Sequence, residues 1–114
     1  TYIHAPIVEN QHATEVGEKG WYDLEIVKQR WPENPECVIV DGPPGFIGRT
    51  GVLSMLDKLA SVSLILVDDI DRQAELQLLQ MLSTRLDRIQ TTYDVEKPRE
   101  GGSNRRFATL TRRP

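Results

Sequence analysis

Two short apolar runs constrain the fold of this chain more than any other feature. Cys37-Val38-Ile39-Val40 and Ser63-Leu64-Ile65-Leu66-Val67 show no alternation of polar and apolar residues, which is typical of strands buried on both faces of a parallel sheet. Asp41 follows the first run directly, and Asp68 and Asp69 follow the second. Because ligands bind beyond the carboxyl ends of such strands, we expect these three carboxylates to share one rim.

The segments around the two runs have the patterns of further strands and helices. Their alternation predicts an α/β fold with a Rossmann-like, mostly parallel sheet that carries helices on its faces. The strands at 37–40 and 63–67 would be neighbours in this sheet. The other expected elements are strands within 2–8 and at 21–22, 88–95 and 106–111, helices over 24–30, 51–60 and up to about 82, a polar turn region over 9–20 and a polar loop over 96–104.

Polar side chains mark where the expected helices begin. Asp23, Thr50 and either Asp69 or Asp71 precede the three helices in that order. Side chains of these types accept hydrogen bonds from the free backbone amides of a first helical turn. The sequence therefore predicts side-chain caps at these positions.

The composition is that of an ordinary globular domain of 114 residues with 39% hydrophobic residues. Cys37 is the only cysteine, which rules out an internal disulfide and a cysteine-based zinc site, and we expect its thiol to be buried and unreactive. No apolar run approaches the roughly 18 residues of a membrane span. The first residues lack the basic and apolar regions of a signal peptide, so a cytoplasmic location is expected.

The charge distribution gives little reason to expect a nucleic-acid partner. The net charge is −3, and acidic residues dominate most of the chain. Arginines gather near the end, where a basic tail can contact nucleic acid. They flank an expected strand, however, so we expect a solvated surface there. The arginines in question are Arg99, Arg105, Arg106, Arg112 and Arg113.

The stretch Gly42-Pro43-Pro44-Gly45-Phe46-Ile47-Gly48-Arg49-Thr50 suggests a phosphate-binding P-loop, as in an ATPase. A P-loop has four residues between its two glycines, whereas five separate Gly42 from Gly48. Arg49 stands where a P-loop has lysine, and a planar guanidinium replaces the compact ammonium charge poorly. An ATPase is therefore the less favoured alternative.

The whole chain resembles the second half of class I S-adenosylmethionine-dependent methyltransferases. The resemblance rests on motifs in the family's order, and no single one of them is specific. They are His4-Ala5-Pro6-Ile7, Trp21-Tyr22-Asp23, Val40-Asp41-Gly42-Pro43-Pro44-Gly45, Leu66-Val67-Asp68-Asp69-Ile70-Asp71-Arg72 and the final strand-like segment Phe107-Ala108-Thr109-Leu110-Thr111-Arg112.

The resemblance also implies that part of the enzyme is not in this sequence. The family's Gly-rich turn after the first strand and its ribose-binding acid after the second have no counterpart here. The chain also begins at Thr1 without a methionine, in a strand-like pattern. We therefore expect residues 1–114 to be one partial domain that lacks the first two strands and binds S-adenosylmethionine weakly or not at all by itself.

The resemblance implies roles for several residues in O-methyl transfer to a small-molecule acceptor. Asp41 would orient or deprotonate the acceptor, with Gly42 and Pro43 beside it at the cofactor. His4 and Ala5 match the place where the family's adenine-contacting loop begins. The plainer interpretations are that Asp41 closes a Gly-Pro turn and that His4 is structural.

Asp41, Asp68 and Asp69 are also candidate ligands for a metal ion. Layouts like this one in catechol-type O-methyltransferases hold Mg²⁺, which lowers the pKa of the acceptor hydroxyls, and carboxylate oxygens suit such a hard cation. The family has an Asp-Asn pair where this chain has Asp68 and Asp69. The plainer interpretation is that Asp69 caps the following helix.

A function of another class stays open, namely a non-catalytic α/β module that binds other chains. A sheet without its first strands would leave the strand at 37–40 with an open edge, which invites pairing with a second copy in a homo-oligomer or with another half. Trp21, Tyr22 and Trp31 are expected to pack over the sheet edge rather than to line an acceptor pocket.

Overall fold

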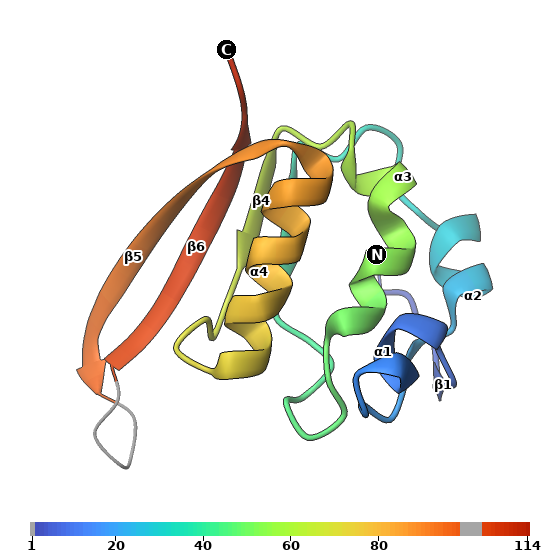
Figure 1. The fold of residues 1–114 in the computed structure, drawn as a ribbon. Coiled ribbons are helices and arrows are strands. Elements are labelled where there is room, and N and C mark those ends of the chain that lie inside the picture. Colours follow the sequence, from blue (N-terminus) through green and yellow to red (C-terminus); the bar gives the residue numbers. More distant parts are fainter. Residues whose placement is uncertain (1, 99–103) are drawn as a thin grey trace.

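The computed structural model describes residues 2–98 and 104–114 and has a mixed α/β fold with two sheets (Figure 1). A small sheet pairs β1 with β2, and the main sheet has the order β3-β4-β6-β5. The elements are β1 (Ile7–Val8), α1 (Gln11–Glu15), β2 (Trp21–Tyr22), α2 (Leu24–Gln29), β3 (Cys37–Val40), the 3-10 helix η1 (Thr50–Met55), α3 (Leu56–Leu59), β4 (Leu64–Val67), α4 (Gln73–Leu86), β5 (Arg88–Pro98) and β6 (Asn104–Arg112).

The main sheet contains one parallel and two antiparallel pairings. β3 and β4 are parallel neighbours, as the sequence predicts, with Val40 opposite Val67. β6 is antiparallel to both β4 and β5, so β5 runs in the same direction as β3 and β4. The prediction of an α/β fold is confirmed, with a mixed sheet. A mostly parallel sheet is not confirmed, because β6 lies between β4 and β5 and is antiparallel to both.

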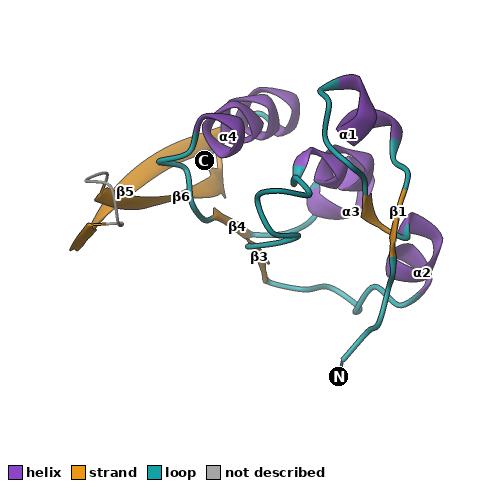
Figure 2. Cartoon of the chain, turned by 90° about the horizontal axis from the view of Figure 1, so that it is seen from below, coloured by secondary structure: helices purple, strands orange, loops and turns teal. Residues whose placement is uncertain are grey.

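The core lies between one face of the main sheet and the helices α3 and α4, which lie on the same side of it (Figure 2). Alternate residues of the strands point into this core, and burying each large apolar side chain contributes roughly 1.5–3 kcal/mol. The fully buried strand and helix residues include Ile65, Val67, Ala108, Leu110, Leu59, Leu78, Leu79 and Leu82.

The opposite face of the sheet remains accessible among the described residues. Cys37 is exposed, and Ile39 is 63% exposed, although both belong to a run with the pattern of a strand buried on both faces. The rings of Tyr93 and Phe107 stack with centroids 5.0 Å apart, on the strands β5 and β6. The prediction of a buried Cys37 is wrong because nothing among the described residues covers this face of β3.

The amino-terminal segment packs against η1. Trp21 lies so close to Gly51 that a Cβ atom at that glycine would be 2.1 Å from the Trp21 Cβ. Asn10 donates a hydrogen bond to the hydroxyl of Ser54 over 3.0 Å, and its own oxygen caps α1, a helix inside the region predicted as turns. The turn prediction for residues 9–20 is therefore wrong over 11–15.

The helix starts agree only in part with the predicted caps. The Asp23 side chain accepts hydrogen bonds from the amides of Glu25 and Ile26, as expected. The N-cap position is Arg49 for the 3-10 helix η1 and Arg72 for α4, rather than the predicted residues, and neither arginine side chain makes a capping hydrogen bond. The Asp71 carboxylate accepts a hydrogen bond from the Arg106 amide.

The ends of β5 and β6 replace part of the polar loop expected over 96–104. Residues 96–98 belong to β5 and residue 104 to β6, while 99–103 lie outside the described residues. Within the described part of the chain, no helix combines the length and the apolar character that crossing a membrane requires.

Candidate functional site: an acidic rim built around Arg49

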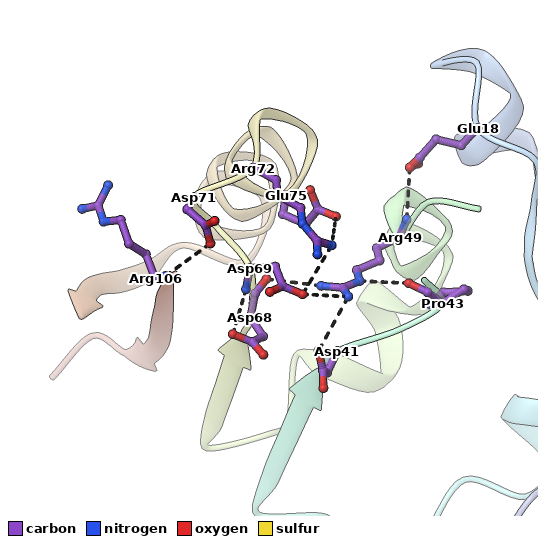
Figure 3. Close-up of polar contacts among 10 residues, drawn as sticks. All are labelled: Glu18, Asp41, Pro43, Arg49, Asp68, Asp69, Asp71, Arg72, Glu75 and Arg106. Carbon is purple, nitrogen blue, oxygen red and sulfur yellow. Dashed lines mark hydrogen bonds and ion pairs between the residues drawn. The ribbon is translucent and has the colours of Figure 1, made fainter. Parts of the chain in front are cut away.

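The carboxyl ends of β3 and β4 bring Asp41, Asp68 and Asp69 together (Figure 3). One carboxylate oxygen from each lies within 4.8 Å of the others. This follows from the parallel register, because residues that come directly after two paired strand ends emerge at the same edge of the sheet. The shared rim predicted from the sequence is therefore present.

The side chain of Arg49 occupies the centre of this rim and is 5% exposed. Its Nε donates to the carbonyl of Pro43 over 3.0 Å, and Nη1 donates to the carbonyl of Asp68 over 3.4 Å. Nη2 lies 3.0 Å from Oδ2 of Asp69 and 3.6 Å from Oδ1 of Asp41. The buried guanidinium is thus paired and hydrogen-bonded, as a buried charge must be.

The role of Arg49 was not predicted from the sequence. There, Arg49 was considered only as a poor replacement for the lysine of a P-loop. One signal for it exists. Three aspartates that meet at adjacent strand ends repel one another unless a cation lies near them. Arg49 stands in the connection between the two strands, eight residues after Asp41, and is the nearest arginine that follows the first strand.

Asp69 is engaged by two arginines. Besides the contact with Arg49, its Oδ2 lies 3.5 Å from Nη1 of Arg72, which also lies 3.8 Å from Oε1 of the buried Glu75. The backbone of Asp69 is left-handed, with φ of 61°. Aspartate is one of the few residues that adopt this conformation readily, which turns the chain from β4 toward α4.

Asp41 differs from Asp69 because its side chain is 60% exposed. Desolvation raises the pKa of Asp41 above the ordinary value of 3.8, and the charge of Asp68 raises it further. Arg49 opposes this effect, whereas Asp69 and a hydrogen bond between the Asp41 and Asp68 side chains add to it. The Asp41 carboxyl group therefore holds its proton more tightly than an isolated aspartate does.

The carboxylate of Glu18 closes the start of η1. It accepts hydrogen bonds from the amides of Arg49 at 3.1 Å and Thr50 at 3.0 Å. Gly48 leaves room for it, with φ of 106° and a Cβ position that would lie 1.9 Å from Glu18. A P-loop uses such amides to bind phosphate, so this arrangement weighs against the ATPase alternative.

A cavity of about 380 Å³ lies beside β3, within the range typical of small-molecule sites. Trp21, Tyr22 and Trp31 contribute to its wall, so they do more than pack over the sheet edge. The Nε1 atom of Trp21 is buried and has no hydrogen-bond partner among the described residues. The lining residues are Trp21, Tyr22, Val27, Trp31, Val38, Ile39, Val40, Asp41, Gly42, Val52, Met55 and Leu59.

Of the two residues that follow Asp41, one lines the cavity and the other is buried. Gly42 lies against the Tyr22 hydroxyl, which would be 2.6 Å from any Cβ at that position. Pro43 is fully buried and contacts Arg49 through its carbonyl. Pro43 is not among the residues that line the cavity.

The structure places Ala5 at a second cavity and His4 on the surface. Ala5 lines a second cavity of about 320 Å³, which shares Tyr22, Val27 and Trp31 with the first. His4 is exposed, just before β1. Ala5 is thus connected to the Asp41 cavity through shared walls, whereas His4 is not among the residues that line either cavity.

Comparisons with known proteins do not identify a family for this arrangement of residues. No family model, no curated protein and no solved structure matches the chain.

Proposed function

We propose that this chain is the second half of a Rossmann-like, S-adenosylmethionine-dependent methyltransferase domain, which transfers a methyl group to an oxygen of a small molecule. The observation that carries the proposal is the meeting of Asp41 and Asp68 at the carboxyl ends of the parallel strands β3 and β4. Asp41 is exposed there, next to a cavity, and the pKa of its carboxyl group is raised by desolvation and by the charge of Asp68.

The direction of the strands supports the Rossmann-like part of the proposal. β3, β4 and β5 run the same way, and β6 alone is reversed. Doubly wound sheets accommodate a reversed strand within an otherwise parallel set. The motif order, from His4-Ala5-Pro6-Ile7 to the final strand, agrees with the same family.

The residues present fit only part of a site for S-adenosylmethionine. Asp41 and Gly42 line the larger cavity and Ala5 the smaller one, so these three would contact the cofactor. Pro43 would act only through its carbonyl on Arg49. The Gly-rich turn and the ribose-binding acid of the family would come from the other half of the domain. When bound, the cofactor supplies a methyl group on a positively charged sulfur.

The chemistry left to this chain is to place the acceptor and to remove a proton. The rim would hold the acceptor oxygen in line with the methyl group that the cofactor would supply, and this positioning is most of the catalysis. The hydroxyl proton passes to Asp41, whose raised pKa makes the carboxylate a better base. Arg49 holds Asp41 through the contact of 3.6 Å.

A divalent cation such as Mg²⁺ fits two of the three predicted ligands. Asp41 and Asp68 would hold it, because Asp69 is already neutralised by Arg49 and Arg72. Such an ion would lower the pKa of the acceptor hydroxyl. Two carboxylates with water or acceptor oxygens are a usual set for Mg²⁺.

The test is methyl transfer by the complete polypeptide that contains this chain, with labelled S-adenosylmethionine and a panel of hydroxylated small molecules. We expect Asp41→Asn to reduce the rate by about 10²–10⁴-fold, the usual contribution of a positioned base. Asp57→Asn is the matched control, since Asp57 pairs with Lys28 away from the rim. Full activity of the Asp41 variant would remove Asp41 from the proposed mechanism.

A further inference from the structure

We infer that the outer edge of β5 pairs with the same edge of a second copy of this chain, so that the two main sheets join into one across a two-fold axis. The two β5 strands run antiparallel, and Thr91 lies on the axis. The inference goes beyond the proposed function and does not require methyl transfer, so each can fail without the other.

The first observation is that β5 lies at the end of the main sheet opposite to β3. The order β3-β4-β6-β5 places β6 on one side of β5, and no strand of the described chain lies on the other side (Figure 1). The strands that the proposed other half of the domain would supply belong beside β3. They would therefore leave the edge of β5 uncovered.

The second observation is that only the carboxyl end of β5 is protected against pairing. Proline and bulges are among the features that keep sheet edges from pairing. Pro98 ends the strand, and the register with β6 is irregular between Val95 and Pro98. Over 88–94 the register is regular, and residues 89–94 are all exposed. The stretch 88–94 is therefore available to a partner strand.

The third observation is the direction of the side chains along this stretch. Gln90 and Thr92 lie opposite Leu110 and Ala108 of β6, which are fully buried in the core. Successive side chains of a strand point to opposite faces of a sheet, so residues 89, 91 and 93 lie on the face away from the core. A slip of one residue would exchange the faces, so the two copies pair only in registers that keep each face continuous.

Among these registers, the one centred on Thr91 fits β5 best. It pairs the whole stretch 88–94 and ends before the irregular part of the strand. A centre at residue 90 would shorten the paired stretch to 88–92. A centre at residue 92 would extend it to residue 96, where the register with β6 is no longer regular.

The side chains that this register brings together suit one another. Ile89 of each copy lies beside Tyr93 of the other, and the two Thr91 side chains lie side by side. Aromatic side chains beside β-branched ones, and threonine beside threonine, stabilise neighbouring strands. Ile89 is 38% exposed and Tyr93 is 44% exposed, so the pairing covers apolar surface. Tyr93 is already held by its stacking on Phe107.

The charges in the same register favour a second copy as the partner. Asp94 of one copy lies opposite Arg88 of the other, so opposite charges meet rather than like ones, which would be destabilising. The Asp94 side chain is 71% exposed and pairs with Arg106 of its own chain over 2.8 Å. The strand is therefore complementary to itself in charge as well as in shape.

The pairing leaves both acidic rims open. β5 runs in the same direction as β3 and β4, whose carboxyl ends carry the rim. Because the two β5 strands are antiparallel, the rims of the two copies lie at opposite ends of the joined sheet.

Sedimentation equilibrium of the complete polypeptide that contains this chain tests the inference. We expect a dimer. Thr91→Lys and Thr91→Glu each place two like charges together on the axis, and each should raise the dimer dissociation constant roughly tenfold or more. Thr91 is exposed, so both variants should stay folded, as circular dichroism checks. Thr84→Lys is the matched control, because Thr84 is exposed on α4, and it should leave the dimer unchanged.

Mixing the two Thr91 variants tests the position of the axis. Lysine of one copy then meets glutamate of the other, so the mixture should form a dimer that neither variant forms alone. A monomeric native polypeptide would overturn the inference, and so would a dimer that Thr91→Lys leaves intact. A mixture of the folded variants that stays monomeric would overturn the register.

A cross-link provides a test that does not depend on charge. Directly opposite residues of antiparallel strands have Cα atoms about 4.5–5.5 Å apart, within the range that a disulfide spans. Mild oxidation of Thr91→Cys should therefore give a covalent dimer that the native polypeptide and Thr84→Cys do not give. Equal cross-linking of the Thr91 and Thr84 variants would contradict pairing through β5.

Discussion

At the scale of single residues, Arg49 determines how the three aspartates of the rim differ. It contacts Asp69 closely and Asp41 at a longer distance, so the two carboxylates are neutralised to different degrees. Asp69 becomes a structural partner of the arginines, and Asp41 keeps an exposed carboxylate with a raised pKa. The chemical role of the rim therefore depends on a residue that would not itself react.

Replacing Arg49 by methionine should destabilise the protein by about 3–5 kcal/mol, because removing one partner of a buried ion pair leaves the other charge uncompensated. Urea unfolding followed by circular dichroism measures this change. Arg113→Met is the control, since Arg113 pairs with Asp87 at the surface, where an ion pair contributes little. An Arg49→Met variant as stable as the control would show that the buried pairing is not needed.

The pKa of Asp41 leads to a prediction about stability and pH. Because its folded-state pKa is raised above 3.8, the folded protein holds this proton more tightly than the unfolded chain. The resulting stabilisation is present below about pH 3.8 and is lost as the pH rises through the folded-state pKa. We expect Asp41→Asn to be at least as stable as the native chain at pH 7, and the advantage to shrink in acid. Urea unfolding at both pH values checks this, and a less stable variant at pH 7 would contradict it.

At the scale of secondary-structure elements, Arg88 links the start of β5 to the end of α3. This side chain is 3% exposed. Its Nη2 donates to the carbonyls of Leu59 over 3.2 Å and Ala60 over 3.1 Å, and Nη1 donates to Ser63 over 3.4 Å. A cation is favourable at the carboxyl end of a helix. The short helix α3 is thereby fixed to the strand that follows α4.

Replacing Arg88 by methionine should lower the free energy of unfolding by about 2–4 kcal/mol, because three carbonyls, among them that of the buried Leu59, lose their donor. Arg88→Lys should restore only part of the lost free energy of unfolding. A guanidinium group donates to several acceptors from one planar fork, and an ammonium group cannot reproduce this arrangement. Thermal unfolding of the two variants provides the measurement. Equal stability of Arg88→Met and the native chain would mean that water satisfies these carbonyls.

At the scale of the whole molecule, local sequence patterns predict the strands and their pairing better than they predict what covers each face of the sheet. The runs 37–40 and 63–67 were sufficient to predict β3, β4 and their parallel pairing, since continuous apolar strands favour it. The exposure of Ile39 was not predictable, because a sequence pattern does not reveal what covers the second face. Helix α1 was missed because it is short and buries only Ala13.

The candidate site, like the fold, could be predicted from the sequence only in part. Asp41, Asp68 and Asp69 were found because their positions depend only on where two strands end. Arg49 was missed because its burial depends on a loop that folds back over both strand ends, which is a tertiary property. The same holds for the cavity beside β3, whose wall combines residues from β2, α2, β3 and η1.

The most direct measurement of the central claim is a calorimetric titration of S-adenosylmethionine into the complete polypeptide that contains this chain. The proposal predicts binding in the micromolar range, and much weaker binding or none by residues 1–114 alone, because the cofactor site needs the other half of the domain. A complete, folded polypeptide that binds no S-adenosylmethionine would contradict the proposed function.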